Sequence, residues 1–422
     1  MDMGTGKTLV SIALALHWWR TEGLRRMLVV CPKSVAQVWP EEFAKHGIEE
    51  VEAVALTGSL AQRAKRLVEQ KPSDRLQVAV INYEAVWRLI DEIAAWQPGM
   101  IVCDESHKIK DPSAKQSKAL HKLRNIPQWR MILTGTPTPN NLLEVFSQYK
   151  FLDHSVFGDS WWAFKHRYGV WGGYGNHQLC GYRYKEELLH KMYSVAYRIT
   201  KQEALDLPEQ TIVKRYVELD RDTSRLYDQV KRDCIAMLDS GDIITARIVL
   251  TQLMRLSQVT GGFVTTEEGG VKQVGNEKLK ALEDLLEDLG QKQVVIFARF
   301  VPEVKAICSM LDKMKIPNGA IYGEVPSDER ARAIKAFQDG GIRAIVAQIA
   351  TGGLGITLTA ADTAIFYSMD YSYANHDQAC ARIHRLGQKN NVTYIYLISP
   401  ETVDEDVFEA VQNKRNLAEE VD

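Results

Sequence analysis

The sequence predicts an α/β fold made of two parallel-sheet units with a mainly helical insertion between them. Short apolar runs typical of buried strands alternate with helical runs over residues 1–150 and again over residues 276–400. Over residues 151–275 this alternation stops, and aromatic and helical segments replace it. We therefore expect an α/β domain at 1–150, a helical insertion and linker at 151–275, a second α/β domain at 276–400 and a C-terminal helix at 401–422.

The composition is that of an ordinary globular protein. Of the 422 residues 45% are hydrophobic and 25% are charged, so the chain can bury the cores of two or three domains. Six cysteines are scattered without a Cys-x-x-Cys pair, which argues against a zinc site or a disulfide framework and is typical of the reducing cytoplasm. No apolar stretch reaches membrane-spanning length, and the first residues are not a signal peptide. We expect a cytoplasmic monomer without a membrane partner.

The first residues match the end of a phosphate-binding loop, and a helical run follows over residues 9–19. The loop residues are Gly4, Thr5, Gly6, Lys7 and Thr8. Backbone N–H groups of such a loop surround phosphates, and the helix N-terminus adds a favourable dipole. Lys7 would reach the β- and γ-phosphates, and Thr8 would be a ligand of Mg²⁺. The alternative is a glycine turn that caps a helix.

The loop departs from the full pattern at its first position. In the window G-x-x-x-x-G-K-T, Met1 stands where glycine is expected, and no residues are left for the strand that normally precedes the loop. Either the chain is a truncation, or another segment fills that place in the sheet.

Two adjacent carboxylates follow a short apolar run near residue 100. The run Met100–Cys103 predicts a buried strand, and Asp104 and Glu105 come directly after it. Ligands of open α/β sheets bind at the carboxyl ends of the strands, so we expect this pair at the mouth of a site. One carboxylate can hold Mg²⁺ while its neighbour polarises a water, as nucleotide hydrolysis requires. The alternative is a strand that runs into an acidic turn.

Three further predicted strands of the first unit also end in polar residues. The strands are Met27–Cys31, Val78–Tyr83 and Met131–Leu133. The residues at or just after their ends are Pro32, Lys33 and Ser34, then Asn82 and Tyr83, then Thr134, Gly135 and Thr136. The hydroxyls of the last group can couple the nucleotide to a nucleic-acid site, and the alternative is an ordinary Gly/Pro turn.

Two segments have the composition of nucleic-acid contacts, although each admits a simpler interpretation. Because the formal net charge is −2, any DNA binding must come from local patches. Residues 107–130 carry seven Lys and Arg side chains opposed only by Asp111, which is typical of a solvated helical face or of a phosphate contact. Residues 157–184 mix aromatic and basic side chains, which favours a helical insertion with its own small core over a stacking surface for bases.

The second α/β unit ends in a segment with two arginines three residues apart. Its predicted strands are 293–297, 344–347, 363–367 and 392–398, and a glycine-rich turn stands at 351–355. On a helix over residues 378–388, Arg382 and Arg385 would share one face. Two guanidiniums on one face suit a phosphoryl group whose charge grows in the transition state. The alternative is a solvated basic helix.

Taken in order, these motifs resemble the Swi/Snf-type ATPases of helicase superfamily two. The matching segments are DMGTGKT, VVCPKSVAQVW, VINYE, DESHKIK, LTGTPTPN, VVIFARF, GGLGITLTAADTAIFY and QACARIHRLGQ. Their order and spacing agree with the family from residue 1 to about 400, and LTGTP with RIHRLGQ is more specific than a lone phosphate loop. The segment YRITKQEALDLP and the helix that ends near Leu253–Val259 resemble parts of the family's helical insertion.

The resemblance implies two RecA-like lobes that bind ATP and Mg²⁺ between them and move along duplex DNA. Carried over by position, the catalytic residues are Lys7, Asp104 and Glu105 of the first lobe with Gln378, Arg382 and Arg385 of the second. Asp104 and Thr8 would hold the metal, Glu105 would activate the attacking water, and the two arginines would act as fingers. The nucleotide-binding residues would be Gly4, Thr5, Gly6, Lys7, Thr8 and Gly355. The positions implied to face nucleic acid, or to link it to ATP, are Pro32, Lys33, Ser34, Asn82, Tyr83, Thr134, Gly135, Thr136, Gly352 and Gly353.

The sequence departs from the family in two places. The family's segment upstream of the phosphate loop, which forms the first strand and contacts adenine, is absent, and Ile349 and Ala350 stand where eukaryotic members often carry a basic residue. The compact length and the lack of bromodomain-like or chromodomain-like segments favour a bacterial or phage member. One alternative function is a nucleic-acid-binding module with impaired or lost ATPase activity. Another is an RNA-duplex unwinding enzyme, which shares the core but matches LTGTP and RIHRLGQ less well.

Overall fold

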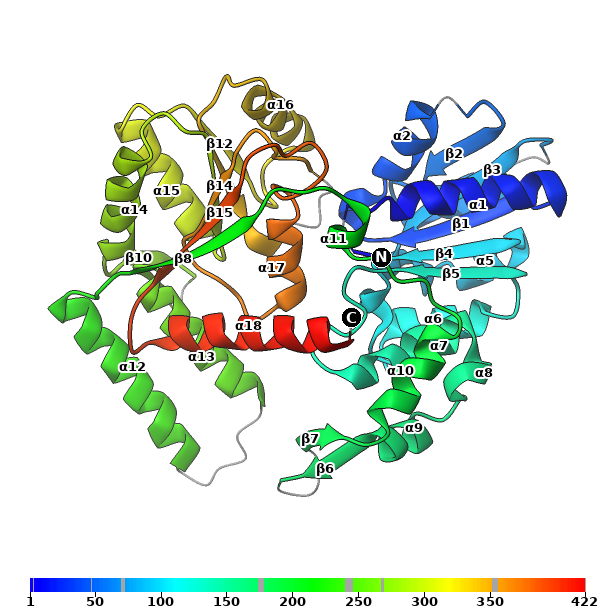
Figure 1. Ribbon diagram of the computed structural model, residues 1–422, viewed down its shortest axis with the longest axis horizontal. Helices are drawn as coiled ribbons and strands as arrows, with labels where there is room; N and C mark the ends of the chain where they lie inside the picture. The colour runs from blue at the N-terminus through cyan, green and yellow to red at the C-terminus, as the bar shows by residue number, and fades with distance from the viewer. Residues whose placement is uncertain are drawn as a thin grey trace. The chain divides into compact units, whose positions relative to one another are not determined.

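Figure 1 shows the computed structural model of the chain, which describes residues 1–2, 4–46, 48–69, 73–173, 178–239, 246–266, 269–350 and 356–421. Contacts within the chain divide it into two compact units. The first contains Met1–Leu205 together with the residues from Leu417 onward, and the second contains Asp206–Asn416. The boundary falls inside the segment 151–275, and the four-part division made from the sequence stays a prediction.

The first unit is built on a five-stranded parallel sheet with the strand order β2-β3-β1-β4-β5. Its strands are β1 (Arg26–Cys31), β2 (Val51–Ala55), β3 (Leu76–Asn82), β4 (Met100–Asp104) and β5 (Trp129–Leu133). The four strands predicted in this unit are confirmed within two residues at each end, and β2 is an additional one. In the part of the chain that the structure describes, β5 is the edge strand, and no further strand pairs beyond it.

Helices cover both faces of this sheet. The helices of the first unit are α1 (Lys7–Thr21), α2 (Val38–Lys45), α3 (Leu60–Val68), α4 (Tyr83–Val86), α5 (Ile90–Trp96), α6 (Lys115–Leu123), α7 (Val145–Leu152), α8 (His154–Phe157), α9 (Trp161–Tyr168), α10 (Lys185–Tyr193) and α11 (Lys201–Ala204), with short 3₁₀ turns η1 (Lys33–Val35), η2 (Ser106–Ile109) and η3 (Leu142–Glu144). Of these, α8, α9 and α10 pack with α7 in a separate cluster. Because strand side chains alternate, Leu28 and Val30 pack with α5 and α6, whereas Met27 and Val29 pack with α1 and α2. Both faces are therefore apolar, as a doubly covered parallel sheet requires.

The aromatic side chains of residues 157–184 mostly form a small core, as the sequence predicts. Phe146 of α7 packs against Phe164 of α9, with ring centroids 5.0 Å apart, and Tyr149 of α7 packs against Phe157 of α8, with ring centroids 5.2 Å apart. A short antiparallel hairpin of β6 (Gly169–Gly172) and β7 (Gln178–Tyr182) follows α9. Trp162 is the exception on this helix, since its side chain is exposed.

The second unit is built on a six-stranded parallel sheet with the order β12-β13-β11-β14-β15-β8. Its strands are β8 (Gln210–Tyr216), β11 (Val294–Ala298), β12 (Asn318–Ile321), β13 (Ala344–Gln348), β14 (Thr363–Phe366) and β15 (Val392–Ile398). Its helices are α12 (Arg221–Asp239), α13 (Ala246–Thr260), α14 (Glu277–Asp288), α15 (Val301–Lys313), α16 (Ser327–Gln338), α17 (Tyr373–Cys380) and α18 (Val403–Val421), of which the residues from Leu417 are assigned to the first unit. Val295 and Phe297 of β11 face one apolar cluster, and Val294 and Ile296 face the other.

Strand β8 is the main element that the sequence analysis missed. The strand ends at Tyr216, and the next helix, α12, begins at Arg221. The strand lies at the edge of the sheet and is exposed along its whole length, so it lacks the apolar alternation that identifies a strand in sequence. The segment predicted as insertion and linker also contains the antiparallel pair β9 (Phe263–Thr265) and β10 (Val271–Gln273).

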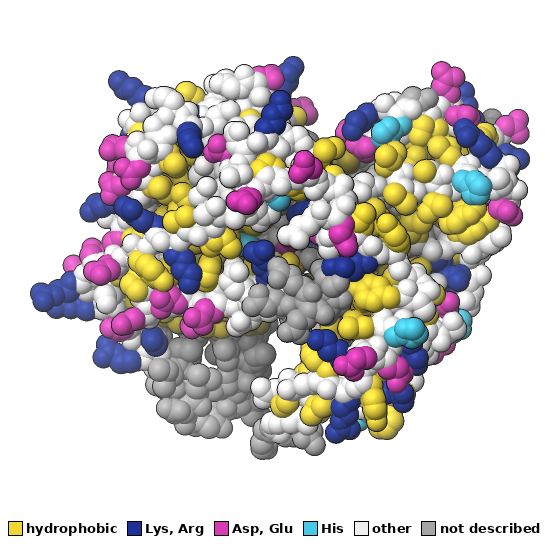
Figure 2. Space-filling view, viewed as in Figure 1, with side chains coloured by type: hydrophobic (Ala, Val, Ile, Leu, Met, Phe, Trp, Pro, Cys, Tyr) yellow, Lys and Arg dark blue, Asp and Glu magenta, His cyan; other side chains and the backbone are white. Residues whose placement is uncertain are grey.

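The predicted fold class is confirmed, since two parallel α/β sheets flank a mainly helical stretch of chain. Among the described residues, no helix is both long and apolar enough to cross a membrane. On the face shown in Figure 2, Lys and Arg side chains are interspersed with Asp and Glu, in keeping with the small net charge.

Candidate functional site

The polar ends of four parallel strands meet at one edge of the first sheet. Cys31 at the end of β1 is aligned with Asn82 at the end of β3, and Asp104 at the end of β4 is aligned with Leu133 at the end of β5. The residues that follow these strands therefore share the carboxyl edge of the sheet. Ligands of α/β proteins bind at such edges, so the polar groups predicted from the sequence gather where a ligand site is expected.

The phosphate-loop residues form a tight turn into α1. Gly4 has φ 86° and Gly6 has φ 89°, a left-handed conformation that glycine adopts without a steric penalty. Gly6 is the N-cap of α1 and gives no side-chain cap, so the first backbone N–H groups of a 15-residue helix stay available to an anion. The ammonium of Lys7 donates to the carbonyl oxygens of Met1 (3.1 Å) and Asp2 (2.8 Å).

The acidic pair after β4 lies within the electrostatic reach of Lys7. Burial and the charge of Glu105 raise the pKa of Asp104 to about 6, against the opposing effects of the Trp39 indole and the Lys7 ammonium. The indole Nε1 of Trp39 donates to Oδ2 of Asp104 over 3.0 Å, and the backbone N–H of Glu105 donates to Oδ1 over 3.0 Å. The aspartate is thus held from both oxygens.

Glu105 adopts a backbone conformation that is rare for a residue with a side chain. Its φ is 52°, in the left-handed region, immediately before the 3₁₀ turn η2. Its Oε2 lies 3.4 Å from Nδ1 of His107, which is buried. Such conformations persist where the surrounding structure fixes them, and they cluster at functional sites.

The carboxylate and hydroxyl oxygens at this edge are typical ligands of Mg²⁺ that is bound jointly by the protein, phosphate oxygens and waters. Among the described residues, no group of three or more His, Cys, Asp and Glu side chains is arranged to bind a metal ion. Mg²⁺ is usually bound by one or two carboxylates together with phosphate oxygens and waters. Asp104, with Thr8 in the first turn of α1, matches that incomplete set.

The residues predicted to face nucleic acid lie along the same edge, with different exposures. Lys33 and Ser34 are exposed in η1, directly after β1. Asn82 accepts from Arg63 Nη1 over 2.6 Å, so its side chain is already held within the fold. Tyr83 is buried, and its hydroxyl donates to the carbonyl of Asp104 over 2.8 Å.

The turn after β5 is folded on itself. The hydroxyl of Thr134 accepts from the backbone N–H of Thr136 over 3.0 Å. Thr136 is buried, and its own Oγ1 has no hydrogen-bond partner in the part of the chain that the structure describes. Gly135 lies between them. Of the glycines predicted in the second unit, Gly352, Gly353 and Gly355 lie outside the described residues.

The two arginines of the second unit do not lie on a helix, which corrects the prediction. Helix α17 carries Gln378, which is buried, but it ends at Cys380, and Arg382 and Arg385 follow in successive turns. The carbonyl of Arg382 accepts from the backbone N–H of Leu358 over 2.9 Å, so it is turned away from a continuing helix. The helix predicted over residues 378–388 from the spacing of the two arginines is therefore wrong beyond Cys380.

Buried polar groups hold the arginine-bearing turns in place. Pro208 offers only its carbonyl oxygen to His384 Nε2 (2.8 Å), so Nε2 carries the proton and Nδ1 accepts from Gln210 Nε2 (2.5 Å). Gln388 donates to the carbonyl of Ala361 over 2.7 Å. These bonds tie the turns to the residue that begins β8 and to the loop before β14.

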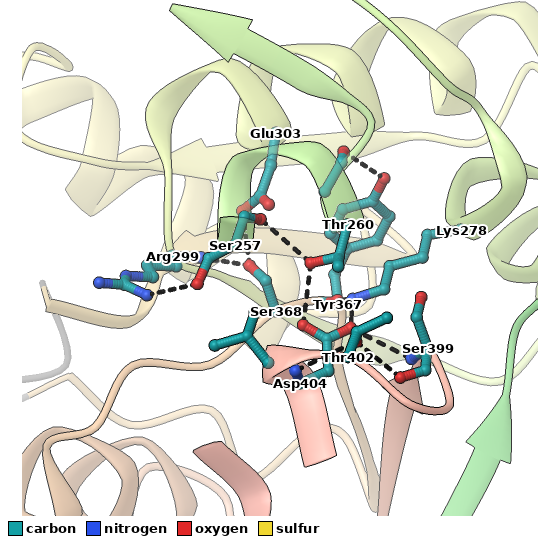
Figure 3. Close-up of polar contacts among 12 residues, drawn as sticks. Ser257, Thr260, Lys278, Arg299, Glu303, Tyr367, Ser368, Ser399, Thr402 and Asp404 are labelled. Carbon is teal, nitrogen blue, oxygen red and sulfur yellow. Dashed lines mark hydrogen bonds and ion pairs between the residues drawn. The ribbon is translucent and has the colours of Figure 1, made fainter. Parts of the chain in front are cut away.

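A second polar cluster lies inside the second unit, beside the carboxyl ends of β11, β14 and β15. Figure 3 shows Lys278 of α14 beside Asp404 of α18, with Nζ and Oδ2 2.6 Å apart. Glu303 of α15 accepts from Ser368 Oγ and from the backbone N–H of Phe300. Burial, opposed by these hydrogen bonds, raises the pKa of Glu303 to about 7.

Sequence reasoning missed Trp39 and His384 as residues that hold the site. Both stand inside segments that the resemblance had matched, VVCPKSVAQVW and QACARIHRLGQ, but no role followed from their spacing. Their partners, Asp104 and Gln210, are 65 and 174 residues away in sequence, so only the fold brings them together.

Two protein families match the chain. Residues 1–261 match the SNF2-related domain, and residues 277–387 match the helicase conserved C-terminal domain.

The chain is also similar over nearly its whole length to several known proteins. It is 28% identical to the human SWI/SNF-related matrix-associated actin-dependent regulator of chromatin subfamily A member 1, covering 99% of this chain and 40% of that protein. It is 28% identical to the mouse chromodomain-helicase-DNA-binding protein 1-like, covering 99% of this chain and 46% of that protein, and 26% identical to an uncharacterized ATP-dependent helicase of Mycoplasma genitalium, covering 99% and 39%. The chain thus spans less than half the length of these relatives.

Among solved structures, the chain is similar to the Sulfolobus solfataricus SWI2/SNF2 ATPase core in complex with dsDNA. The sequence identity is 27%, the TM-score is 0.44, and the match covers 100% of this chain and 87% of that one.

Proposed function

The chain belongs to the SNF2-related family, and on that premise we propose that it is an ATPase that is stimulated by DNA and moves along duplex DNA. The observation that carries the proposal is the common edge of the first sheet. There the ammonium of Lys7 lies within electrostatic reach of Asp104, and Glu105 follows directly. A positive group for phosphates beside two carboxylates is the arrangement that nucleotide hydrolysis requires.

We assign the phosphate groups of ATP to the turn that begins α1. The backbone N–H groups of Gly4, Thr5 and Gly6 would surround the β-phosphate, and Lys7 would move from the carbonyls of Met1 and Asp2 to the phosphates. Asp104 and Thr8 would hold Mg²⁺, which when bound neutralises charge on the β- and γ-phosphates. Asp104 is suited to this because Trp39 and the backbone of Glu105 fix both of its oxygens.

Glu105 is the residue we assign to the attacking water. A general base has to be held at a defined angle to the γ-phosphate, and the left-handed backbone of Glu105 fixes the direction in which its side chain leaves the turn. His107, 3.4 Å from Oε2, restricts the carboxylate further. Both features are local to the turn after β4.

We propose that residues of the second α/β unit stabilise the negative charge that develops on the γ-phosphate in the transition state. Arg382 and Arg385 would be arginine fingers, Gln378 would support them, and Gly355 would contact the nucleotide. An arginine finger contributes ~10³–10⁵ to the rate of phosphoryl transfer. The two units would approach each other and separate once per ATP, which would move the chain along DNA.

Duplex DNA is the proposed partner, and RNA is the less favoured one. The proposed contact residues are Pro32, Lys33, Ser34, Asn82, Tyr83, Thr134, Gly135, Thr136, Gly352 and Gly353. Lys33 and Ser34 are exposed at the edge of the sheet, which supports a contact there between these side chains and the phosphate backbone of DNA. We retain the division into 1–150, 151–275, 276–400 and 401–422 as part of the proposal.

The test is phosphate release by the chain with saturating Mg·ATP, in the presence and absence of duplex DNA, with duplex RNA as a competitor. We expect DNA to raise turnover more than RNA does, and a Glu105→Gln variant to bind ATP while losing turnover by ~10²–10⁴. Turnover that ignores DNA would contradict the proposal. DNA binding that ignores ATP and Mg²⁺, without turnover, would instead favour a binding module that has lost catalysis.

A further inference from the structure

Helix α7 meets the acidic turn through a buried glutamine. Gln148 and Ser106 are 1% and 0% exposed, and Ser106 is the residue directly after the pair Asp104–Glu105. Ser106 Oγ and Gln148 Oε1 are 2.7 Å apart. Gln148 Nε2 lies 2.7 Å from the carbonyl oxygen of Pro137 and 3.1 Å from that of Glu144. One side chain therefore contacts the turn after β4 and the turn after β5.

The orientation of this amide follows from its partners. The carbonyls of Pro137 and Glu144 only accept hydrogen bonds, so the NH₂ group of Gln148 must face them. The oxygen of the amide then faces Ser106, and the Ser106 hydroxyl must donate. Both amide protons and the amide oxygen are used. A fully satisfied buried polar group specifies one arrangement of the elements that it joins, because any displacement leaves a polar atom unpaired.

A second contact of the same segment lies nearer to solvent. Lys110, at the end of η2, forms an ion pair of 2.9 Å with Glu144 at the end of η3. Glu144 also accepts from the backbone N–H (3.0 Å) and the side chain (2.7 Å) of Asn140. This half-buried ion pair also joins the segment after β4 to the segment after β5, on the side nearer to solvent. Water screens it more than it screens the hydrogen bonds of Gln148.

We propose that Gln148 is a positioning residue that transmits the state of the acidic turn to the Thr134–Pro137 turn. It touches neither nucleotide nor DNA and acts through Ser106 on one side and Pro137 on the other. The Thr134–Pro137 turn has a reason to respond, since Thr136 Oγ1 is buried and has no partner among the residues that the structure describes, and a shift of the turn would let it find one. The inference rests on the proposed function, because the transmitted event is nucleotide binding beside Asp104–Glu105.

The test compares Gln148→Met with Gln77→Met. Both changes replace a buried glutamine in the first unit by an apolar side chain of similar length, but Gln77 lies at the amino end of β3, where its Oε1 contacts Arg26. Gln148→Met removes all three hydrogen bonds of the amide. We expect it to lower DNA-stimulated kcat by about tenfold or more, while the KM for ATP and the turnover without DNA stay within about twofold. Gln77→Met should keep the wild-type stimulation ratio.

Hydrogen exchange gives a readout that does not depend on DNA. In the wild-type chain, a non-hydrolysable ATP analogue with Mg²⁺ should change the exchange of the backbone amides of Thr134–Thr136, and in Gln148→Met it should not. If turnover does not depend on DNA, but the ATP analogue still changes the exchange of Thr134–Thr136 in the wild-type chain and not in Gln148→Met, the proposed function is overturned and the positioning role is kept. Unchanged stimulation and exchange in Gln148→Met, or equal losses in both variants that follow their loss of thermal stability, would overturn the positioning role.

Discussion

The indole nitrogen of Trp39 donates a hydrogen bond to Oδ2 of Asp104 over 3.0 Å. Trp39 is 1% exposed on α2, and Asp104 ends β4, so the bond joins a helix on one face of the sheet to the carboxyl edge. Hydrogen bonds to charged groups contribute about 1.5–3 kcal/mol, and this one opposes the burial and the Glu105 charge that raise the pKa of Asp104. Trp39 thus stabilises the ionised carboxylate that is proposed to hold Mg²⁺.

We expect Trp39→Phe to raise the Mg²⁺ concentration for half-maximal ATPase activity by about tenfold, because an aromatic ring remains but the hydrogen bond is lost. The measurement is a Mg²⁺ titration of phosphate release at saturating ATP and DNA. Trp96→Phe is the matched control, since Trp96 is buried in the same unit and its Nε1 has no hydrogen-bond partner among the described residues. Equal Mg²⁺ requirements in the two variants would contradict the role given to Trp39.

Arg385→Ala should lower DNA-stimulated turnover by ~10³ or more while the chain still binds ATP. In the structure Arg385 is partly exposed, and Nη1 lies 3.4 Å from the carbonyl oxygen of Ile356. Single-turnover phosphate release and the binding of a fluorescent ATP analogue separate the two effects. Arg332→Ala, an exposed arginine of α16, is the control and should keep wild-type turnover. Full turnover in Arg385→Ala would remove its assignment as a finger.

The strands of both sheets were predictable wherever a continuous apolar run marks burial on two faces. Met100–Cys103 and Val392–Ile398 are examples, and the structure places strands over these residues. Edge strand β8 was not predictable, because its exposed residues QTIVKRY show neither a continuous apolar run nor alternation. Its place in the sheet comes from pairing with β15, 182 residues later, which no local pattern encodes.

The candidate site was predictable where a short motif carries the chemistry, as at Lys7 and Asp104. It was not predictable where a distant side chain holds the motif, as Trp39, Gln148 and His384 do. The arginine segment shows a third limit. Spacing of three residues suggested a helical face for Arg382 and Arg385, but α17 ends at Cys380, before either arginine.

Lys278→Met should lower the free energy of unfolding of the second unit by about 3–5 kcal/mol. Lys278 is buried, and its removal leaves Asp404 without its cation, although Thr260 Oγ1 (2.9 Å) and the backbone N–H of Ser399 (3.1 Å) still donate to that carboxylate. Urea unfolding followed by a probe in the second unit measures the change. Lys305→Met breaks an exposed pair and should change stability by about 1 kcal/mol or less, so similar values for the two variants would contradict the prediction.

Glu303→Gln should flatten the fall in stability of the second unit between about pH 4.5 and pH 7. The pKa of Glu303 is raised from 4.5 to about 7, chiefly by burial, so within this window the folded state holds a proton that the unfolded state has released. Raising the pH therefore favours unfolding, and the loss approaches on the order of 3 kcal/mol above pH 7. Glutamine has no proton to release, yet its oxygen can still accept from Ser368 and from the backbone of Phe300, near the groups shown in Figure 3. The difference in unfolding free energy between variant and wild type, measured at pH 5 and at pH 8, should thus shift in favour of the variant at pH 8. A difference that does not change with pH would mean that Glu303 does not titrate in this window.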